Sequence, residues 1–281
     1  AVSALTFGAA QWLTSQGVPV IGAAEDGPEW ITSQNMFSIY GALDTTKVST
    51  TYGDFFKSQG VTTVGALGYG ISPASAEQAK AAALSAQHAG LKSGYVNANF
   101  EFGSTNVQPV AIAMKNAGVD GMTATVDPNT GFSLISALRN LGDPPKVALL
   151  PTGYGGDLLQ AGPGALQDAQ GVYFSSSFEP AEMHTAATEQ LLRDLKTAGV
   201  SGDPTYAEYA GYSSMAMLVE ALEGAGSNPS HASLIGGLTA IHGFNAAGLL
   251  GSHSITPSDR ASTPIGVDGC YYITKLSGSS F

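Results

Sequence analysis

Apolar runs typical of strands alternate with helix-compatible stretches over the first half of the chain. The expected strands cover residues 18–21, 62–69, 93–100, 119–126 and 145–151. The expected helices cover 75–90, 106–118 and 131–142, and each ends at a glycine suited to a C-cap: Gly90, Gly118 and Gly142. Continuous apolar strands separated by helices predict βαβ units around a parallel sheet with helices on both faces.

After Pro151 the pattern becomes less regular. The expected elements are a loop with a short helix over 155–171, a strand over 172–180, helices over 181–199, 204–226 and 231–244, and extended segments over 248–256 and 269–276. Tyrosines and methionines recur at helical spacing within 204–226, which predicts core packing for that stripe. No linker rich in Pro and Ser divides the chain, which favours two lobes joined by several crossings of the backbone.

Composition narrows the classes of partner. The 281 residues are enough for two lobes. Asp and Glu number 22 against 11 Lys and Arg, giving a net charge of -11, so nucleic acid and anionic membranes would be repelled. No apolar run approaches the roughly 18 residues that a membrane-spanning helix needs.

Neither the cysteine content nor the first residues identify the cellular compartment. Cys270 is the single cysteine, which excludes a disulfide within the chain, and its setting in the segment 269–276 predicts a buried strand residue. The stretch 1–13 lacks the basic region of a signal peptide.

Signatures of catalysis and of cofactors are weak. The chain has no G-x-S-x-G motif, and the glycine-rich segments 68–73 and 153–156 lack, respectively, the third glycine and the lysine of nucleotide-binding loops. His231, His242 and His253 recur at equal intervals, but they fall on different expected elements without nearby carboxylate or cysteine ligands. We therefore expect a non-enzymatic protein without metal or cofactor.

Several stretches in the same order resemble the leucine/isoleucine/valine-binding proteins, the type I extracytoplasmic solute-binding components of ABC importers. These stretches are VSALTFGAAQWLTSQ, GVPVIGAAEDGPEW, FGSTNVQPVAIAMKNAGVDGM, VDPNTGFSLISALRNLG and PTYAEYAGYSSMAMLVEAL. The resemblance implies an α/β fold of two lobes with three hinge crossings and a ligand enclosed between the lobes. It assigns 1–38 and 178–267 to lobe 1 and 39–177 and 268–281 to lobe 2. Family members begin with further strand and helix units, so lobe 1 is expected to lack its N-terminal βα units here.

The resemblance also places ligand contacts in lobe 1. The family's carboxylate-binding serine falls on Ser3, and its next binding loop falls on Ala24 and Asp26, where the family has a hydroxyl. The family's acidic residue for an ammonium group falls on Thr152. A carboxylate has thus moved from one wall of the expected cleft to the other.

Two interpretations of Asp26 remain open. Asp26, with Glu25, can pair with a cationic or N–H-bearing group of the ligand, because a carboxylate facing an ammonium makes a strong contact. Alternatively, Asp26 caps a helix that begins near Pro28.

In lobe 2, five polar residues fall at the ends of expected strands, where ligand contacts are expected: Tyr69, Ser72, Asp127, Thr152 and Tyr154. Trp12 and Trp30 are expected to be packing residues.

The predicted function is capture of a small ligand, a branched-chain amino acid, an amide or a related polar or carboxylated molecule, by closure of two lobes. An ABC permease in the membrane is the expected partner, and the location is extracytoplasmic, either periplasmic or at the cell surface with a lipid anchor. The alternatives are a ligand sensor of the same fold and an α/β enzyme with Asp26 or Asp127 as general base.

Overall fold

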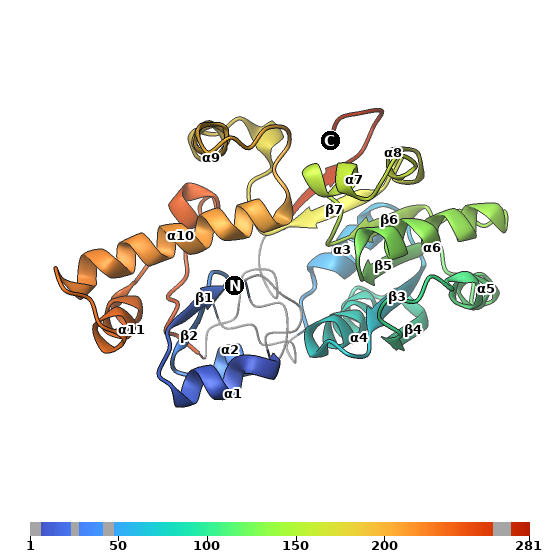
Figure 1. The fold of residues 1–281 in the computed structure, drawn as a ribbon. Coiled ribbons are helices and arrows are strands. Elements are labelled where there is room, and N and C mark those ends of the chain that lie inside the picture. Colours follow the sequence, from blue (N-terminus) through green and yellow to red (C-terminus); the bar gives the residue numbers. More distant parts are fainter. Residues whose placement is uncertain (1–6, 24–27, 42–47, 261–270) are drawn as a thin grey trace. The chain divides into compact units, whose positions relative to one another are not determined.

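The chain forms two units of helices and strands (Figure 1). The computed structural model describes residues 7–23, 28–41, 48–260 and 271–281. Unit 1 comprises Ala1–Asp44, Ser177–Ser201 and Ala207–Gly266, and unit 2 comprises Thr45–Ser176, Gly202–Tyr206 and Val267–Phe281. Each unit is described separately below.

A six-stranded sheet forms the centre of unit 2. Its strands are β3 (Thr63–Tyr69), β4 (Lys92–Phe100), β5 (Gly121–Thr125), β6 (Val147–Leu150), β7 (Tyr173–Ser176) and β8 (Tyr272–Lys275). Their order is β4-β3-β5-β6-β7-β8, and all neighbours are parallel except β7 and β8. Every residue of β3 and β6 is buried, as expected for parallel strands covered on both faces. The predicted α/β class with a parallel sheet is confirmed.

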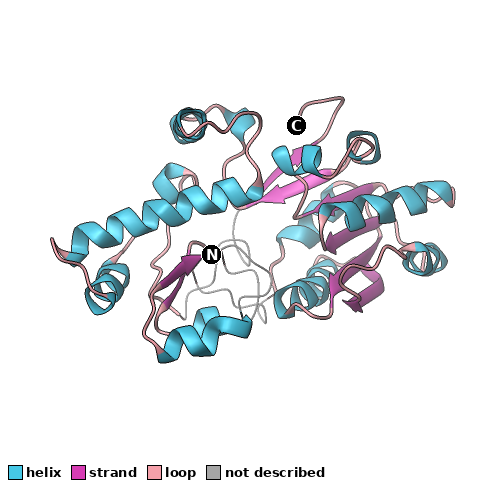
Figure 2. Ribbon diagram, in the orientation of Figure 1, coloured by secondary structure: helices cyan, strands magenta, loops and turns pink. Residues whose placement is uncertain are grey.

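Helices flank this sheet (Figure 2). They are α3 (Thr51–Ser58), α4 (Pro73–His88), α5 (Gln108–Asn116), α6 (Pro128–Asn140), and the short α7 (Gly156–Gln160) and α8 (Ala165–Asp168). The chain steps from β3 outward to β4, and then back past β3 to β5. Because such crossovers are right-handed, α4 lies on one face and α5 and α6 lie on the other.

Glycines end the helices where the sequence predicted. Gly90, Gly118 and Gly142 have φ of 83°, 66° and 70°, the left-handed region that a C-cap requires. At Gly90 the backbone N–H donates to Gln87 O at 2.9 Å, and the next N–H, of Leu91, donates to Ala86 O at 2.9 Å. These bonds satisfy carbonyls that the end of α4 leaves unpaired.

Gly68 lets α4 begin directly against β3. A Cβ atom at Gly68 would lie 2.3 Å from Ser75 O, so no other residue fits at this position without a backbone shift. Ser75 Oγ accepts the N–H of Tyr69 at 2.7 Å and donates to Thr125 O of β5. The glycine and the serine together fix the ends of β3 and β5 beside the start of α4.

Unit 1 contains a short parallel pair of strands and a helix of 20 residues. Its elements are α1 (Phe7–Ser15), β1 (Val20–Gly22), α2 (Glu29–Thr32), β2 (Met36–Ser38), α9 (Ala186–Thr197), α10 (Tyr206–Ala225), α11 (His231–Ala240) and the 3₁₀ turns η1 (Ala181–Met183) and η2 (Ala246–Gly248). Trp30 and Met36 form a buried cluster with Ala10. Phe178 stacks on Tyr209 of α10 with ring centroids 5.5 Å apart.

Three of the elements expected beyond Pro151 differ in the structure. The helix expected over 181–199 divides into η1 and α9, because His184 adopts a left-handed conformation with φ of 50° and Thr185 caps α9 by accepting the N–H of Thr188. The segment 248–256 is not a strand but contains the end of η2 and turns, with Phe244 and Ile255 forming an isolated bridge. The loop over 155–171 contains two short helices instead of one.

The packing predictions hold for some aromatic and methionine residues and fail for others. Trp30, Tyr209 and Met217 are buried as expected. Trp12 is 63% exposed and Met215 is 57% exposed, so the expectation of core packing is wrong at these two positions. Helix α10 therefore has one side that is buried and another that is exposed.

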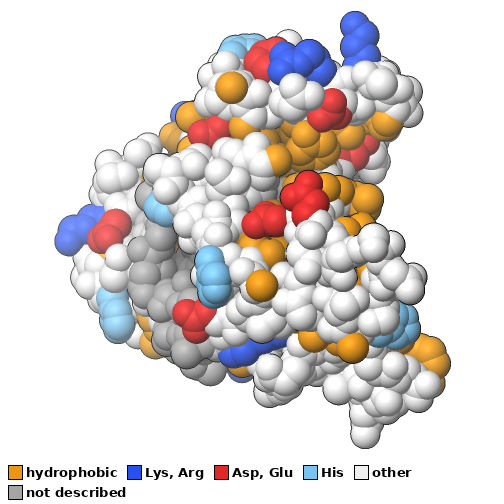
Figure 3. Space-filling view, turned by 90° about the vertical axis from the view of Figure 1, so that its left-hand side faces the viewer, with side chains coloured by type: hydrophobic (Ala, Val, Ile, Leu, Met, Phe, Trp, Pro, Cys, Tyr) orange, Lys and Arg blue, Asp and Glu red, His pale blue; other side chains and the backbone are white. Residues whose placement is uncertain are grey.

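Charged side chains are sparse on the surface. Figure 3 shows one face on which basic and acidic side chains are scattered among uncharged ones, without a basic patch among the described residues drawn there. This distribution agrees with a chain in which charged residues are 12% of the total.

Candidate functional site

Polar side chains gather where β3 and β5 end. These strands are parallel neighbours, with Gly68 in register with Thr125. The chain then enters α4 after β3 and α6 after β5, on opposite faces of the sheet. Such a reversal of strand order leaves an opening beyond the carboxyl ends of the two strands, which is where α/β sheets bind ligands.

Tyr69 and Asp127 bridge this point. Tyr69 ends β3, and Asp127 is the N-cap of α6. The Tyr69 hydroxyl donates to Asp127 Oδ2. Thr130 Oγ1 donates to the same oxygen at 2.6 Å, and Thr130 N donates to Asp127 Oδ1 at 3.1 Å. An Asp before a Pro in the first helical turn is a favoured cap, which explains why this carboxylate is held so firmly.

The hydrogen bonds fix the charge states of the pair. Burial opposes ionisation of Asp127, but the hydrogen bonds from Thr130 and Tyr69 outweigh it and lower the pKa of this carboxyl. Burial, reinforced by Asp127, raises the pKa of Tyr69 to about 12. At neutral pH the site therefore holds a carboxylate and a protonated phenol in fixed positions.

The other predicted residues of unit 2 have separate roles. Thr152 Oγ1 donates to Val126 O at 2.8 Å, which ties the end of β6 to the residue before Asp127. Ser72 is buried and caps α4 by accepting the N–H of Ser75 at 3.3 Å. Tyr154 is buried, and its ring packs edge-on against Phe281 with centroids 4.9 Å apart. The structure thus brings Tyr69, Asp127 and Thr152 to one edge, whereas Ser72 and Tyr154 make structural contacts there.

The predicted contacts of lobe 1 lie outside the described residues. These are Ser3, Ala24, Glu25 and Asp26. Cys270 also lies outside them. The helix that Asp26 was expected to cap is α2, which begins at Glu29 with Pro28 in the N-cap position.

Two residues at this edge were missed by the sequence reasoning. Thr130 completes the hydrogen-bonded group, and the spacing of Asp127 and Thr130 around Pro128 is a cap signal that could have identified it. Phe102 follows β4, is 57% exposed, and lies edge-on to Tyr69 with ring centroids 5.1 Å apart. Phe102 lies in a loop outside any periodic pattern, so the sequence gave no signal that predicts its position.

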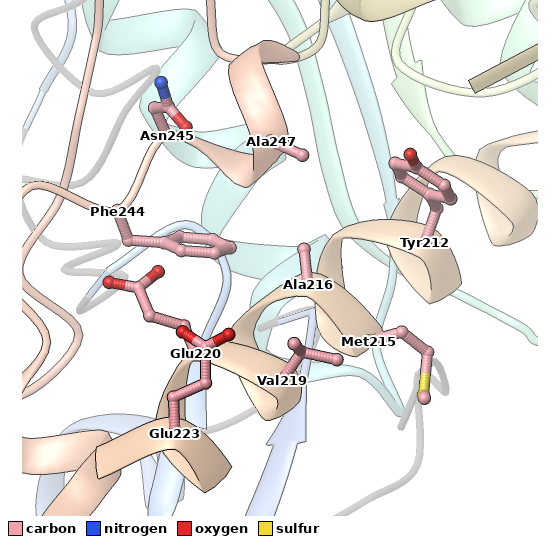
Figure 4. A pocket seen from close by; sticks show the side chains of 9 residues that line it. All are labelled: Tyr212, Met215, Ala216, Val219, Glu220, Glu223, Phe244, Asn245 and Ala247. Carbon is pink, nitrogen blue, oxygen red and sulfur yellow. The ribbon is translucent and has the colours of Figure 1, made fainter. Parts of the chain in front are cut away.

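Unit 1 has a separate hollow of about 670 Å³ along α10 (Figure 4). None of the predicted site residues that the structure describes lines it. At one end Tyr212 donates its hydroxyl to Asp194 Oδ2 at 2.7 Å, and burial together with Asp194 raises the pKa of Tyr212 to about 12. The lining residues are Tyr212, Met215, Ala216, Val219, Glu220, Glu223, Phe244, Asn245 and Ala247.

The part of the chain that the structure describes contains no group of three or more His, Cys, Asp or Glu residues placed to hold a metal ion. Among the described helices, none combines the length and the apolar character required to cross a bilayer.

Comparisons with known proteins agree with this architecture. The family model described as "Periplasmic binding protein" matches residues 1–280. A solute-binding protein of an ABC transporter from R. palustris, in complex with 4-hydroxybenzoate, is 15% identical with a TM-score of 0.75, covering 96% of this chain and 72% of that chain. The leucine-binding protein LivK from Thermotoga maritima is 16% identical with a TM-score of 0.72, covering 87% of this chain and 68% of that chain.

An extracellular ligand-binding receptor from Rhodopseudomonas palustris HaA2 is 15% identical with a TM-score of 0.77, covering 99% of this chain and 79% of that chain. A comparison with curated protein sequences gives no match. At these identities the solved structures establish the fold.

Proposed function

Because the chain belongs to the periplasmic binding protein family, we propose that it is the extracytoplasmic solute-binding component of an ABC importer. The observation that carries the proposal is the hydrogen-bonded group of Tyr69, Asp127 and Thr130 where the strand order reverses. A rigid polar group at such a point is suited to binding a small molecule. The ligand class is a branched-chain amino acid, an amide or a related small polar or carboxylated compound.

The solved relatives support this range of ligands. Solved structures of this fold include complexes with 4-hydroxybenzoate and with benzoate, and a leucine-binding protein, so the fold accommodates both aromatic acids and an amino acid. We propose that Tyr69, Asp127 and Thr152 contact the ligand from unit 2, with Ser72 and Tyr154 supporting them. Ser3, Ala24, Glu25 and Asp26 are the proposed contacts of the other lobe.

The proposed lobes are 1–38 with 178–267 and 39–177 with 268–281, connected by three hinge crossings. The division of the chain into two compact units supports this proposal. Gly202–Tyr206 groups with unit 2 in the structure, because Pro204 O accepts the N–H of Gly156 at 3.2 Å and Asp157 Oδ2 accepts that of Tyr206 at 3.0 Å.

The proposed mechanism is a shift in population. A ligand that binds one conformation better than another shifts the protein toward that conformation, and a membrane permease that recognises the liganded form completes the transport step. Family membership implies an extracytoplasmic location. The lowered pKa of Asp127 makes it a weak base at neutral pH, which supports a binding role over general-base catalysis.

A thermal-shift screen tests the proposal. Leucine, isoleucine, valine, small amides, benzoate and 4-hydroxybenzoate are each added to the chain, because a ligand present at 100 times its Kd stabilises the native state by about 2.7 kcal/mol. We expect a raised Tm with at least one compound and a smaller rise in Tyr69→Phe. Tyr95→Phe is the matched control, since Tyr95 is a half-buried tyrosine of β4. A flat response to the whole panel would reject the proposed ligand class.

A further inference from the structure

We propose that the end of β5 accepts hydrogen bonds from a ligand and does not donate them. We define this acceptor face as Tyr69, Asp127, Thr130 and Thr152. It would receive the ammonium, amide N–H or hydroxyl end of a ligand and reject a carboxylate or phosphate. The inference rests on the proposed function and specifies which end of the ligand meets unit 2.

The hydroxyl protons of the acceptor face point inward. The protons of Tyr69 and Thr130 are directed to the carboxylate of Asp127, and that of Thr152 is directed to Val126 O. A hydroxyl has one proton, so each of these groups can offer only lone pairs to an incoming molecule. A hydrogen bond to an ionised carboxylate is stronger than one between neutral groups. If Tyr69 or Thr130 turned its proton toward a ligand, its bond to Asp127 would be lost.

The start of α6 does not supply the missing donors. Helix N-termini commonly bind anions through free N–H groups. Here Pro128 has no N–H, the N–H of Thr130 donates to Asp127 Oδ1 at 3.1 Å, and the N–H of Asn129 also bonds to Asp127. The protein's own carboxylate therefore occupies the position that an anionic ligand would take.

Exposure shows which atoms a ligand meets. Asp127 is exposed, whereas Tyr69 and Thr130 are buried behind it and Thr152 is half-buried. A ligand carboxylate would face an ionised carboxylate with no donor between them, which is unfavourable. The exposed ring of Phe102, packed on Tyr69, offers apolar surface nearby. Together these groups fit a small molecule with an apolar body and a hydrogen-bond-donating end.

Two probes that share one ring test the acceptor face. Benzylammonium and benzoate are titrated at constant ionic strength, and the backbone amide signal of Thr130 reports binding by NMR. We expect benzylammonium to bind about tenfold more tightly than benzoate at this position, as one charge-assisted contact would provide. In Asp127→Asn the preference should largely disappear, because Asn can donate as well as accept and caps a helix about as well as Asp.

Matched variants separate local chemistry from the overall negative charge. Asp54→Asn removes one carboxylate from an exposed position of α3 and should leave the preference unchanged. Tyr69→Phe keeps the charge of Asp127 and should keep the preference for the cation. An equal change in Asp54→Asn and Asp127→Asn, tighter binding of benzoate, or no shift of Thr130 with either probe would overturn the inference. A ligand that raises the Tm without affecting Thr130 would preserve the proposed function while rejecting the acceptor face.

Discussion

The acceptor face of unit 2 and the hollow along α10 of unit 1 both combine carboxylates with apolar surface, but they differ in how their polar groups are satisfied. Asp127 receives hydrogen bonds from a phenol, a hydroxyl and the backbone. Glu220 and Glu223 form no ion pair among the described residues, beside the exposed Met215 and Val219. A group held by several partners is preorganised for a specific contact, whereas Glu220 and Glu223 have no ion pair among the described residues to fix their positions.

The largest expected difference lies within α10. Met217→Ala should lower the free energy of unfolding by about 2–5 kcal/mol, because Met217 is fully buried and its loss leaves a cavity. Met215→Ala removes the same atoms from the open side and should change it by less than about 0.5 kcal/mol. Urea unfolding followed by circular dichroism measures both. Similar losses in the two variants would mean that the hollow is filled in solution.

Next in size is the removal of the carboxylate from the acceptor face. Asp127→Ala should cost about 1–3 kcal/mol, since it removes a helix cap and the charged acceptor that two buried hydroxyls share. Asp127→Asn should cost less because an amide oxygen can still cap α6. Equal stability of Asp127→Ala and the unchanged protein in urea would show that the hydrogen-bonded group does not form.

Asp127 should also make the stability of the protein depend on pH in the acidic range. The pKa of Asp127 is lowered in the folded protein, so the unfolded chain binds more protons as pH falls below the ordinary Asp pKa of about 3.9. The stabilisation from ionised Asp127 is complete above that value and is lost as pH falls through the folded pKa. The stability of Asp127→Asn should therefore decline less steeply below about pH 5, as measured by Tm across a pH series. Parallel curves would contradict the lowered pKa.

The smallest effect is expected at the hollow. Glu223 lies in the last turn of α10, where a negative charge is unfavourable, and it follows Glu220 by three positions. Glu223→Gln should raise the free energy of unfolding by about 0.2–0.5 kcal/mol at low salt, with the gain fading in high salt. A loss of stability would reveal a favourable partner for this carboxylate.

Local signals in the sequence predicted the elements around the site. The glycines that end α4, α5 and α6, and the apolar runs that form β3, β5 and β6, act through conformation and burial of nearby residues. Asp127 was placed correctly at a strand end because it directly follows the apolar run 119–126, which is a local feature. These parts of the fold need no knowledge of distant contacts.

The remaining features depend on contacts between segments far apart in the chain. The bond between Tyr69 and Asp127 requires β3 and β5 to be neighbours, although β4 separates them in the sequence. On α10, Met215 and Met217 are two positions apart and lie on opposite sides of the helix, and only the packing of the folded unit decides which side is buried. The break at His184 results from competition between a long helical pattern and the strong cap at Thr185.

The antiparallel strand β8 also affects the order in which the protein can fold. During synthesis the five parallel strands of unit 2 leave the ribosome before α9, α10 and α11, and β8 emerges only after these helices to pair with β7. Until then β7 is an open strand edge, which can pair with another chain. Unit 2 can therefore complete its sheet only after the helices of unit 1 have been synthesised. If the pairing of β8 with β7 is delayed, we expect intermediates with an exposed β7 to aggregate, which light scattering would detect.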